Sequence, residues 1–326
     1  MTSRDVIARN LEARAEGRIG FTFSHGRRND MLSVGQKHPP WEQKRWTEDG
    51  KEFYNDIWGN LWFRIQGMSQ GGEVFKPVLE DWADLDRYEL PDLANPALFE
   101  DVRRACSEER EKFRLGSLPG FPFAICRYMR KMEVYFADLV MERERIDALH
   151  GRVADLLEAV IVRYAEAGVD GVFFCEDLGV QDRTLMSPEM WRDIFRPLHE
   201  RLCAAAHARG IKIIQHSCGY NWALVDDLCE AGINGLQFDQ PAVYDQPALA
   251  KKLKGHGVGL WSPCDIQKVL PTGDRALIER ETRRLVETFR GGFIAKNYPD
   301  LKGIGVASEW DQWAYEAFLR YGDQTA

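Results

Sequence analysis

From about residue 120 onward, short apolar runs alternate with longer segments that carry apolar residues at helical spacing. The runs predict buried strands, and the longer segments predict amphipathic helices. Alternation over this length predicts a parallel sheet, and about eight strand–helix units predict a closed (β/α)8 TIM barrel. An open, doubly wound sheet is the alternative. No strand in this sequence is followed by the glycine-rich dinucleotide fingerprint that often accompanies that fold.

The predicted α/β barrel needs eight strands, and the sequence offers eight apolar runs. They are residues 18–24, 121–126, 169–175, 211–216, 234–239, 257–262, 292–295 and 304–307. Residues 52–80 break the pattern, because two aromatic, β-prone runs are separated there by Gly71 and Gly72. We therefore expect a single domain over residues 1–326, with an N-terminal β-hairpin extension inserted at residues 52–80.

Charge and composition exclude several classes of protein. The net charge of -8 argues against a nucleic-acid partner, which requires a basic surface. No apolar run approaches the length of a membrane span, and the N-terminus lacks the apolar core of a signal peptide. The seven cysteines are scattered without the framework of a small disulfide-bonded domain. We expect free thiols and a cytoplasmic protein with no membrane partner.

Polar and titratable residues follow nearly every predicted strand, at the end where barrels of this kind place their chemistry. His216 and Cys218 are the most informative pair, because residues two apart on an extended segment leave the same face. An imidazole and a thiol so placed can bind a soft metal ion, most plausibly zinc. Cys264 is the candidate third ligand. The alternatives are a hydrogen-bonded His beside a buried Cys, and a small side chain in a Ser-Pro turn.

The remaining candidates line the same predicted mouth. Glu176 and Asp177 are adjacent carboxylates, which favours metal ligation or general acid–base catalysis, with capping of the next loop as the alternative for one of them. A hydrophobic core or an ordinary polar loop would account equally well for several of the others. The predicted catalytic residues are His25, Glu176, Asp177 and Asp239, and the predicted substrate-binding residues are Asn29, Trp58, Trp261 and Gln240.

Several motifs together resemble the uroporphyrinogen decarboxylase superfamily over roughly residues 17–321. They include Gly-Val-Asp-Gly at 168–171, Ser-Pro-Glu-Met-Trp at 187–191, His-Ser-Cys-Gly at 216–219 and Glu-Ala-Gly-Ile-Asn at 230–234. The resemblance implies a (β/α)8 barrel and one of two chemistries. True decarboxylases carry an Arg-Gln-Ala-Gly-Arg motif near the N-terminus, which is absent from the corresponding residues 23–30. The other branch consists of corrinoid-dependent methyltransferases.

In that branch, the members that activate a thiol bind zinc through a His-x-Cys pair and a later Cys. His216 and Cys218 match the pair, but the later segment, residues 295–299, contains no cysteine. Cys264 or Glu176 is therefore the expected third ligand. The sequence also lacks the Asp-x-His-x-x-Gly signature of a corrinoid module.

The resemblance thus implies a zinc-dependent methyltransferase component. It would move a methyl group between a small methylated substrate, such as an aryl methyl ether or a methylamine, and the corrinoid (methylcobalamin) of a separate protein. A metal-free decarboxylase and a ligand-binding barrel without catalysis are the alternatives. For the oligomeric state, a homodimer is one of the open possibilities.

Overall fold

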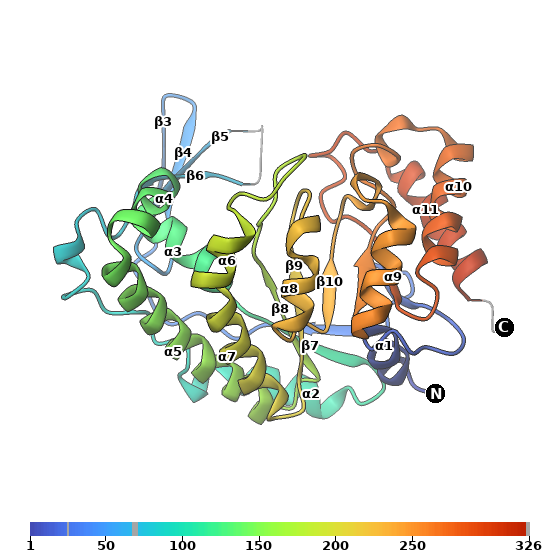
Figure 1. Ribbon diagram of the computed structural model, residues 1–326, viewed down its shortest axis with the longest axis horizontal. Coiled ribbons are helices and arrows are strands. Elements are labelled where there is room, and N and C mark those ends of the chain that lie inside the picture. The colour runs from blue at the N-terminus through green and yellow to red at the C-terminus, as the bar shows by residue number, and fades with distance from the viewer. Residues whose placement is uncertain (25, 67–70, 324–326) are drawn as a thin grey trace.

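The computed structural model describes residues 1–24, 26–66 and 71–323, and its main sheet has eight parallel strands in a nearly closed barrel (Figure 1). The order is β1-β12-β11-β10-β9-β8-β7-β2. The strands are β1 (Gly20–Thr22), β2 (Met31–Val34), β7 (Phe113–Ser117), β8 (Gly171–Cys175), β9 (Lys212–His216), β10 (Gly235–Gln237), β11 (Gly259–Ser262) and β12 (Phe293–Lys296). The predicted TIM barrel is confirmed.

Helices surround the barrel, and the expected end signals fix several of them. The long helix α5 (Arg143–Ala167) ends at Gly168, whose φ of 88° is the left-handed conformation that glycine adopts readily. Helix α6 (Pro188–Ile194) begins after the capping residue Ser187. The others around the barrel are α2 (Glu100–Glu108), α3 (Pro122–Arg130), α4 (Met132–Met141), α7 (Arg196–His207), α8 (Val225–Glu230), α9 (Gln246–His256), α10 (Arg275–Thr288) and α11 (Ser308–Gly322). In the part of the chain described, no helix has the length and apolar character that crossing a membrane requires.

Helix α1 (Ser3–Leu11) closes one end of the barrel. Its buried Ile7 and Leu11 belong to the same apolar cluster as Met31, Phe113 and Ile214 of three barrel strands. The first residues of β1, β10 and β11 are glycines, and a side chain at any of them would collide with α1 or with the chain just beside it. The N-terminal end of the barrel is therefore filled, and the C-terminal ends of the strands form the opposite mouth.

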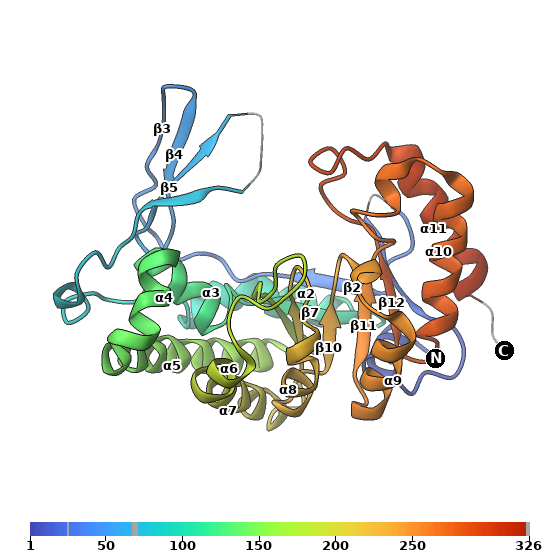
Figure 2. The ribbon, with the colours of Figure 1, turned by 45° about the horizontal axis from the view of Figure 1, so that its top comes forward.

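A separate four-stranded antiparallel sheet stands beside this mouth, above α3 and α4 (Figure 2). It consists of β3 (Arg45–Glu48), β4 (Lys51–Asn55), β5 (Leu61–Ile65) and β6 (Glu73–Lys76). The extension expected at residues 52–80 is confirmed, with one further strand before it. On one face Trp46, Phe53 and Phe75 pack together, and on the other Trp62 contacts Tyr128 of the barrel with ring centroids 4.7 Å apart.

Two of the eight predicted strands are wrong. Residues 121–126 lie at the start of helix α3 (Pro122–Arg130), where proline occupies the first turn and needs no hydrogen-bond donor. All six residues are buried, so the sequence lacks the alternation that separates a strand from a buried helix. Residues 304–307 form a turn before α11. Their places in the barrel are taken by β2 and β7.

The junction between β7 and β8 depends on a buried ion pair, and its removal should destabilise the fold. Asp170 accepts hydrogen bonds from Arg114 Nε at 2.9 Å and Nη2 at 2.8 Å, and from the Arg114 amide at 2.9 Å. We expect Asp170→Ala to lower the free energy of unfolding by about 3 kcal/mol, because Arg114 loses its counterion while largely buried. Asp182→Ala, which removes the exposed partner of Arg183, should lower the free energy of unfolding by less than about 1 kcal/mol. Urea titration measures both variants. Equal losses in the two variants would contradict this account.

Candidate metal centre

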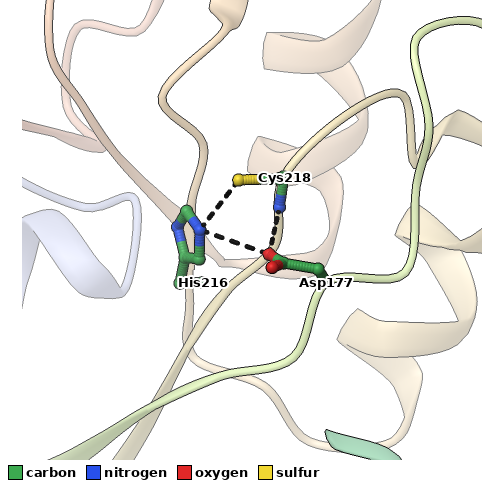
Figure 3. A group of neighbouring side chains, drawn as sticks. All are labelled: Asp177, His216 and Cys218. Atoms are coloured by element: carbon green, nitrogen blue, oxygen red, sulfur yellow. Dashed lines mark hydrogen bonds and ion pairs between the residues drawn. The ribbon is translucent and has the colours of Figure 1, made fainter. Parts of the chain in front are cut away.

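Three side chains from two neighbouring strand ends meet at the barrel mouth. Strands β8 and β9 are parallel, with Cys175 opposite His216. Because the segments that follow β8 and β9 continue in the same direction, Asp177 lies beside His216 and Cys218. One ligand atom from each of these three residues, which we call the metal-facing group, lies within 4.8 Å of the others (Figure 3).

Their contacts are direct. His216 Nε2 lies 3.3 Å from Cys218 Sγ and 3.4 Å from Asp177 Oδ1, and the same Oδ1 accepts the Cys218 amide at 2.9 Å (Figure 3). A nitrogen, a sulfur and an oxygen thus face a common centre. Imidazole, thiolate and carboxylate are all zinc ligands, and three protein ligands leave one position open, as in catalytic zinc sites. The donor set therefore fits the expected metal.

The orientation of His216 is fixed from behind by strand β10. His216 Nδ1 and Gln237 Oε1 are 2.6 Å apart, and the two residues are register partners. The Gln237 amide donates to Asp239 Oδ1 at 2.6 Å, and Lys296 Nζ lies 3.0 Å from the same oxygen. The amide oxygen of Gln237 accepts only from a protonated Nδ1. This series of hydrogen bonds therefore directs Nε2 of His216 toward Asp177 and Cys218. Such a hydrogen bond to the far nitrogen accompanies most histidines that bind metal.

The three side chains also change one another's protonation. Burial disfavours charge on His216, but its contacts with Asp177 and Cys218 and the nearby Asp239 outweigh burial and raise the pKa of His216 to about 11. Burial raises the pKa of Asp177 as well, yet the hydrogen bond and charge of His216 outweigh it and lower that pKa to about 2. In the absence of metal, the pair is therefore an imidazolium and a carboxylate at neutral pH.

The turn after His216 is held by several polar contacts. Gly219 has a φ of 76°, and a side chain there would collide with the backbone of residues 179 and 180. Its amide donates to Gln240 Oε1 at 2.8 Å, so this predicted substrate-binding residue supports the loop that carries Cys218. Asn221 donates to the Cys218 carbonyl at 3.0 Å, and the Tyr244 hydroxyl donates to the Gly219 carbonyl at 2.8 Å.

The two residues considered as third ligand do not join this group. Glu176 is fully buried, with Oε1 3.2 Å from His199 Nε2 and Oε2 accepting the Ala124 amide at 3.2 Å. Cys264 is buried as well, and burial raises the pKa of its thiol to about 12 despite a hydrogen bond with the Thr282 side chain of α10. Both side chains therefore face the packing between barrel and helices, and Asp177 is the third side chain beside His216 and Cys218.

Of the other predicted site residues, some lie near the metal-facing group and others lie away from it. Asp239 lies behind His216, and Trp261 donates to the Thr22 hydroxyl at 2.7 Å while Lys296 lies over its ring. Asn29 accepts the Met31 amide, and Trp58 lines a cavity of about 530 Å³ beside the small sheet, with Tyr88 in the same wall. His25 lies outside the described residues.

Three residues of the site are not among the predicted catalytic, substrate-binding or metal residues: Gln237, Lys296 and Arg127. Gln237 precedes the predicted strand end by two residues, so only the register with β9 reveals it. Lys296 and Arg127 directly follow the predicted strands 292–295 and 121–126, so both stand among the polar residues at predicted strand ends. In the structure Arg127 lies on α3 and donates to the Asp177 carbonyl at 3.3 Å.

A family model and several solved structures resemble this chain. A family model described as uroporphyrinogen decarboxylase (URO-D) matches residues 65–297. A methyltransferase from Methanosarcina mazei is similar in structure, with a TM-score of 0.64, 14% identity and coverage of 81% of this chain and 76% of that one. A D-psicose 3-epimerase from Clostridium cellulolyticum H10 reaches a TM-score of 0.45 at 11% identity, over 74% of this chain and 87% of that one.

At 14% identity the likeness to the Methanosarcina mazei protein concerns the fold alone, and no curated protein matches the sequence. The family model spans most of the 326 residues, including both strand ends that carry the metal-facing group. The chain therefore belongs to the uroporphyrinogen decarboxylase family.

Proposed function

We propose that this chain is a zinc-dependent methyltransferase component that moves a methyl group between a small methylated substrate and the corrinoid of a separate protein. The group formed by Asp177, His216 and Cys218 carries the proposal, because it offers one nitrogen, one sulfur and one oxygen within 4.8 Å. The methyltransferase-like fold supports it. The corrinoid partner follows from the family resemblance and from the lack of a corrinoid signature in this sequence.

In this proposal Asp177, His216 and Cys218 would hold the zinc, which as a Lewis acid would polarise the substrate oxygen or nitrogen that leaves when the methyl group passes to the corrinoid. The surrounding residues have positioning roles. Gln237 holds His216 in the required tautomer, and Lys296 neutralises Asp239 behind it. The Asp177 side chain is 40% exposed, so a small substrate can approach this side of the group from the mouth.

The direct test is methyl transfer by the purified protein. Zinc-loaded protein is mixed with cob(I)alamin and, in separate reactions, an aryl methyl ether or a methylamine, and formation of methylcob(III)alamin is followed by absorbance. We expect transfer from one donor class, loss of transfer in Cys218→Ala, and retention in Cys203→Ala, whose thiol is buried in α7. Transfer that persists after complete removal of metal would contradict the proposal.

The contact behind His216 gives a second expected result. Gln237→Leu removes the acceptor of His216 Nδ1, and we expect zinc affinity to fall roughly 10–100-fold, as for other losses of a ligand's hydrogen-bond partner. Gln215→Leu is the matched control, because Gln215 is equally buried on β9 and its amide has no hydrogen-bond partner in the described chain. Competition with a chromophoric chelator measures both affinities. Unchanged affinity in Gln237→Leu would remove the orienting role.

A further inference from the structure

Arg127 is a buried guanidinium beside the metal-facing group, and the described residues give it no carboxylate partner. It is 6% exposed and lies between the rings of Phe123 and Tyr128. Nη1 donates to the Asp177 carbonyl at 3.3 Å and Nη2 to the Tyr128 hydroxyl at 2.8 Å. Within the described chain, Nε has no acceptor at all and no ion pair involves this side chain.

A second arginine on the same helix shows how a buried positive charge is fully paired in this protein. Arg130 is 4% exposed, and its Nε and Nη2 both lie 2.8 Å from Asp138 Oδ2 while Nη1 donates to the Leu79 carbonyl. Buried charges are ordinarily paired, because an unpaired one incurs a large desolvation penalty. Arg130 follows that rule and Arg127 departs from it, although the two are only three positions apart on α3.

The carboxylates at the ends of strands β8 and β10 are already engaged. Asp239 forms an ion pair with Lys296 at 3.0 Å, and Asp177 accepts the Cys218 amide and faces His216. Glu176, one residue before Asp177, points to His199 and the Ala124 amide. Arg127 therefore forms no ion pair with any of these three carboxylates.

We propose that Arg127 binds a carboxylate group of the substrate. This inference rests on the proposed function. It assigns a chemical class to the substrate of the same site, namely a methylated carboxylic acid. The two Nη groups still have free N–H donors, and a planar guanidinium suits a carboxylate. Since Arg127 is bonded to the backbone of Asp177, it anchors the carboxylate next to the metal-facing group and positions the rest of the substrate toward that group.

The test compares two probes of nearly equal shape, 4-methoxybenzoate and uncharged 4-methoxybenzamide, by calorimetric titration of metal-free and zinc-loaded protein. We expect the benzoate to bind the parent about tenfold or more tightly than the amide in both forms, as for a charge-assisted hydrogen bond. Arg127→Met should reduce this preference to less than about twofold. Arg183→Met, which removes an exposed cation from the loop after β8, should keep it.

Equal affinities for the two probes in the parent, no binding of the benzoate, or a preference that survives Arg127→Met would overturn the inference. If Arg127→Met does not fold, Arg127→Lys replaces it and should weaken the preference, because an ammonium cannot reproduce the planar fork; an unchanged preference there would also overturn the inference. A structural role would instead make Arg127→Met lower the melting temperature as much as Arg130→Met does. An Arg127-dependent preference in protein that binds no zinc would leave this inference standing while the proposed function falls.

Discussion

Replacing Cys218 with alanine is expected to lower the affinity for zinc by more than about 100-fold. A lost ligand should cost more than the roughly 10–100-fold that loss of an orienting neighbour costs. Cys218 offers the one sulfur of the metal-facing group, 3.3 Å from His216 Nε2. The measurement is zinc per chain by mass spectrometry after dialysis, followed by competition with a chelator of known affinity.

Two cysteine variants serve as controls for that result. Cys203→Ala removes a buried thiol from α7, and Cys264→Ala removes the thiol that the sequence left open as a third ligand. Both variants should retain the zinc of the parent. Loss of zinc in Cys264→Ala would restore Cys264 as a ligand, and equal zinc in Cys218→Ala and the parent would reject the metal centre.

Zinc binding is expected to weaken steeply as the pH falls. His216 has a pKa of about 11 in the metal-free protein, so its imidazolium must release a proton before Nε2 can bind metal. Asp177, with a pKa of about 2, is already a carboxylate at neutral pH and releases none. Each released proton lowers the affinity about tenfold per unit decrease in pH, so His216 alone predicts about a 100-fold loss between pH 8 and pH 6.

Calorimetry in buffers with different enthalpies of protonation counts these protons. We expect at least about one proton released per zinc at pH 7, and more when the Cys218 thiol ionises on binding. His216→Ala should release fewer protons and bind zinc weakly. Zinc binding without proton release at pH 7 would show that His216 is not charged in the metal-free site, or that it is not a ligand.

Much of the fold could be predicted from the sequence, because strand–helix alternation has few architectural solutions. The predicted strand ending at His216 is β9, and the small sheet lies where two aromatic runs flank Gly71 and Gly72. Residues 121–126 were misassigned because a fully buried segment has no polar face to reveal its period. β7 was missed for a related reason, since its sequence, FRLGS, contains Arg114 and Gly116 instead of an apolar run.

The site was harder to predict because it depends on register and on side-chain direction. His216 and Cys218 follow from spacing, but the third position depends on which of two adjacent carboxylates faces the mouth. Alternation along the chain turns Glu176 toward His199 and Asp177 toward His216. Spacing alone likewise could not show that Cys264 faces Thr282 on α10.

X-ray absorption at the zinc edge of the reconstituted protein tests the proposed metal centre most directly. Asp177, His216 and Cys218 predict one sulfur at about 2.3 Å, with the remaining ligands nitrogen or oxygen at about 2.0–2.2 Å. Asp177→Ala should keep the sulfur and change the oxygen shell. Two sulfurs in the parent protein would mean that a second cysteine, and not Asp177, is the third ligand. A shell without sulfur would contradict a centre formed by Asp177, His216 and Cys218.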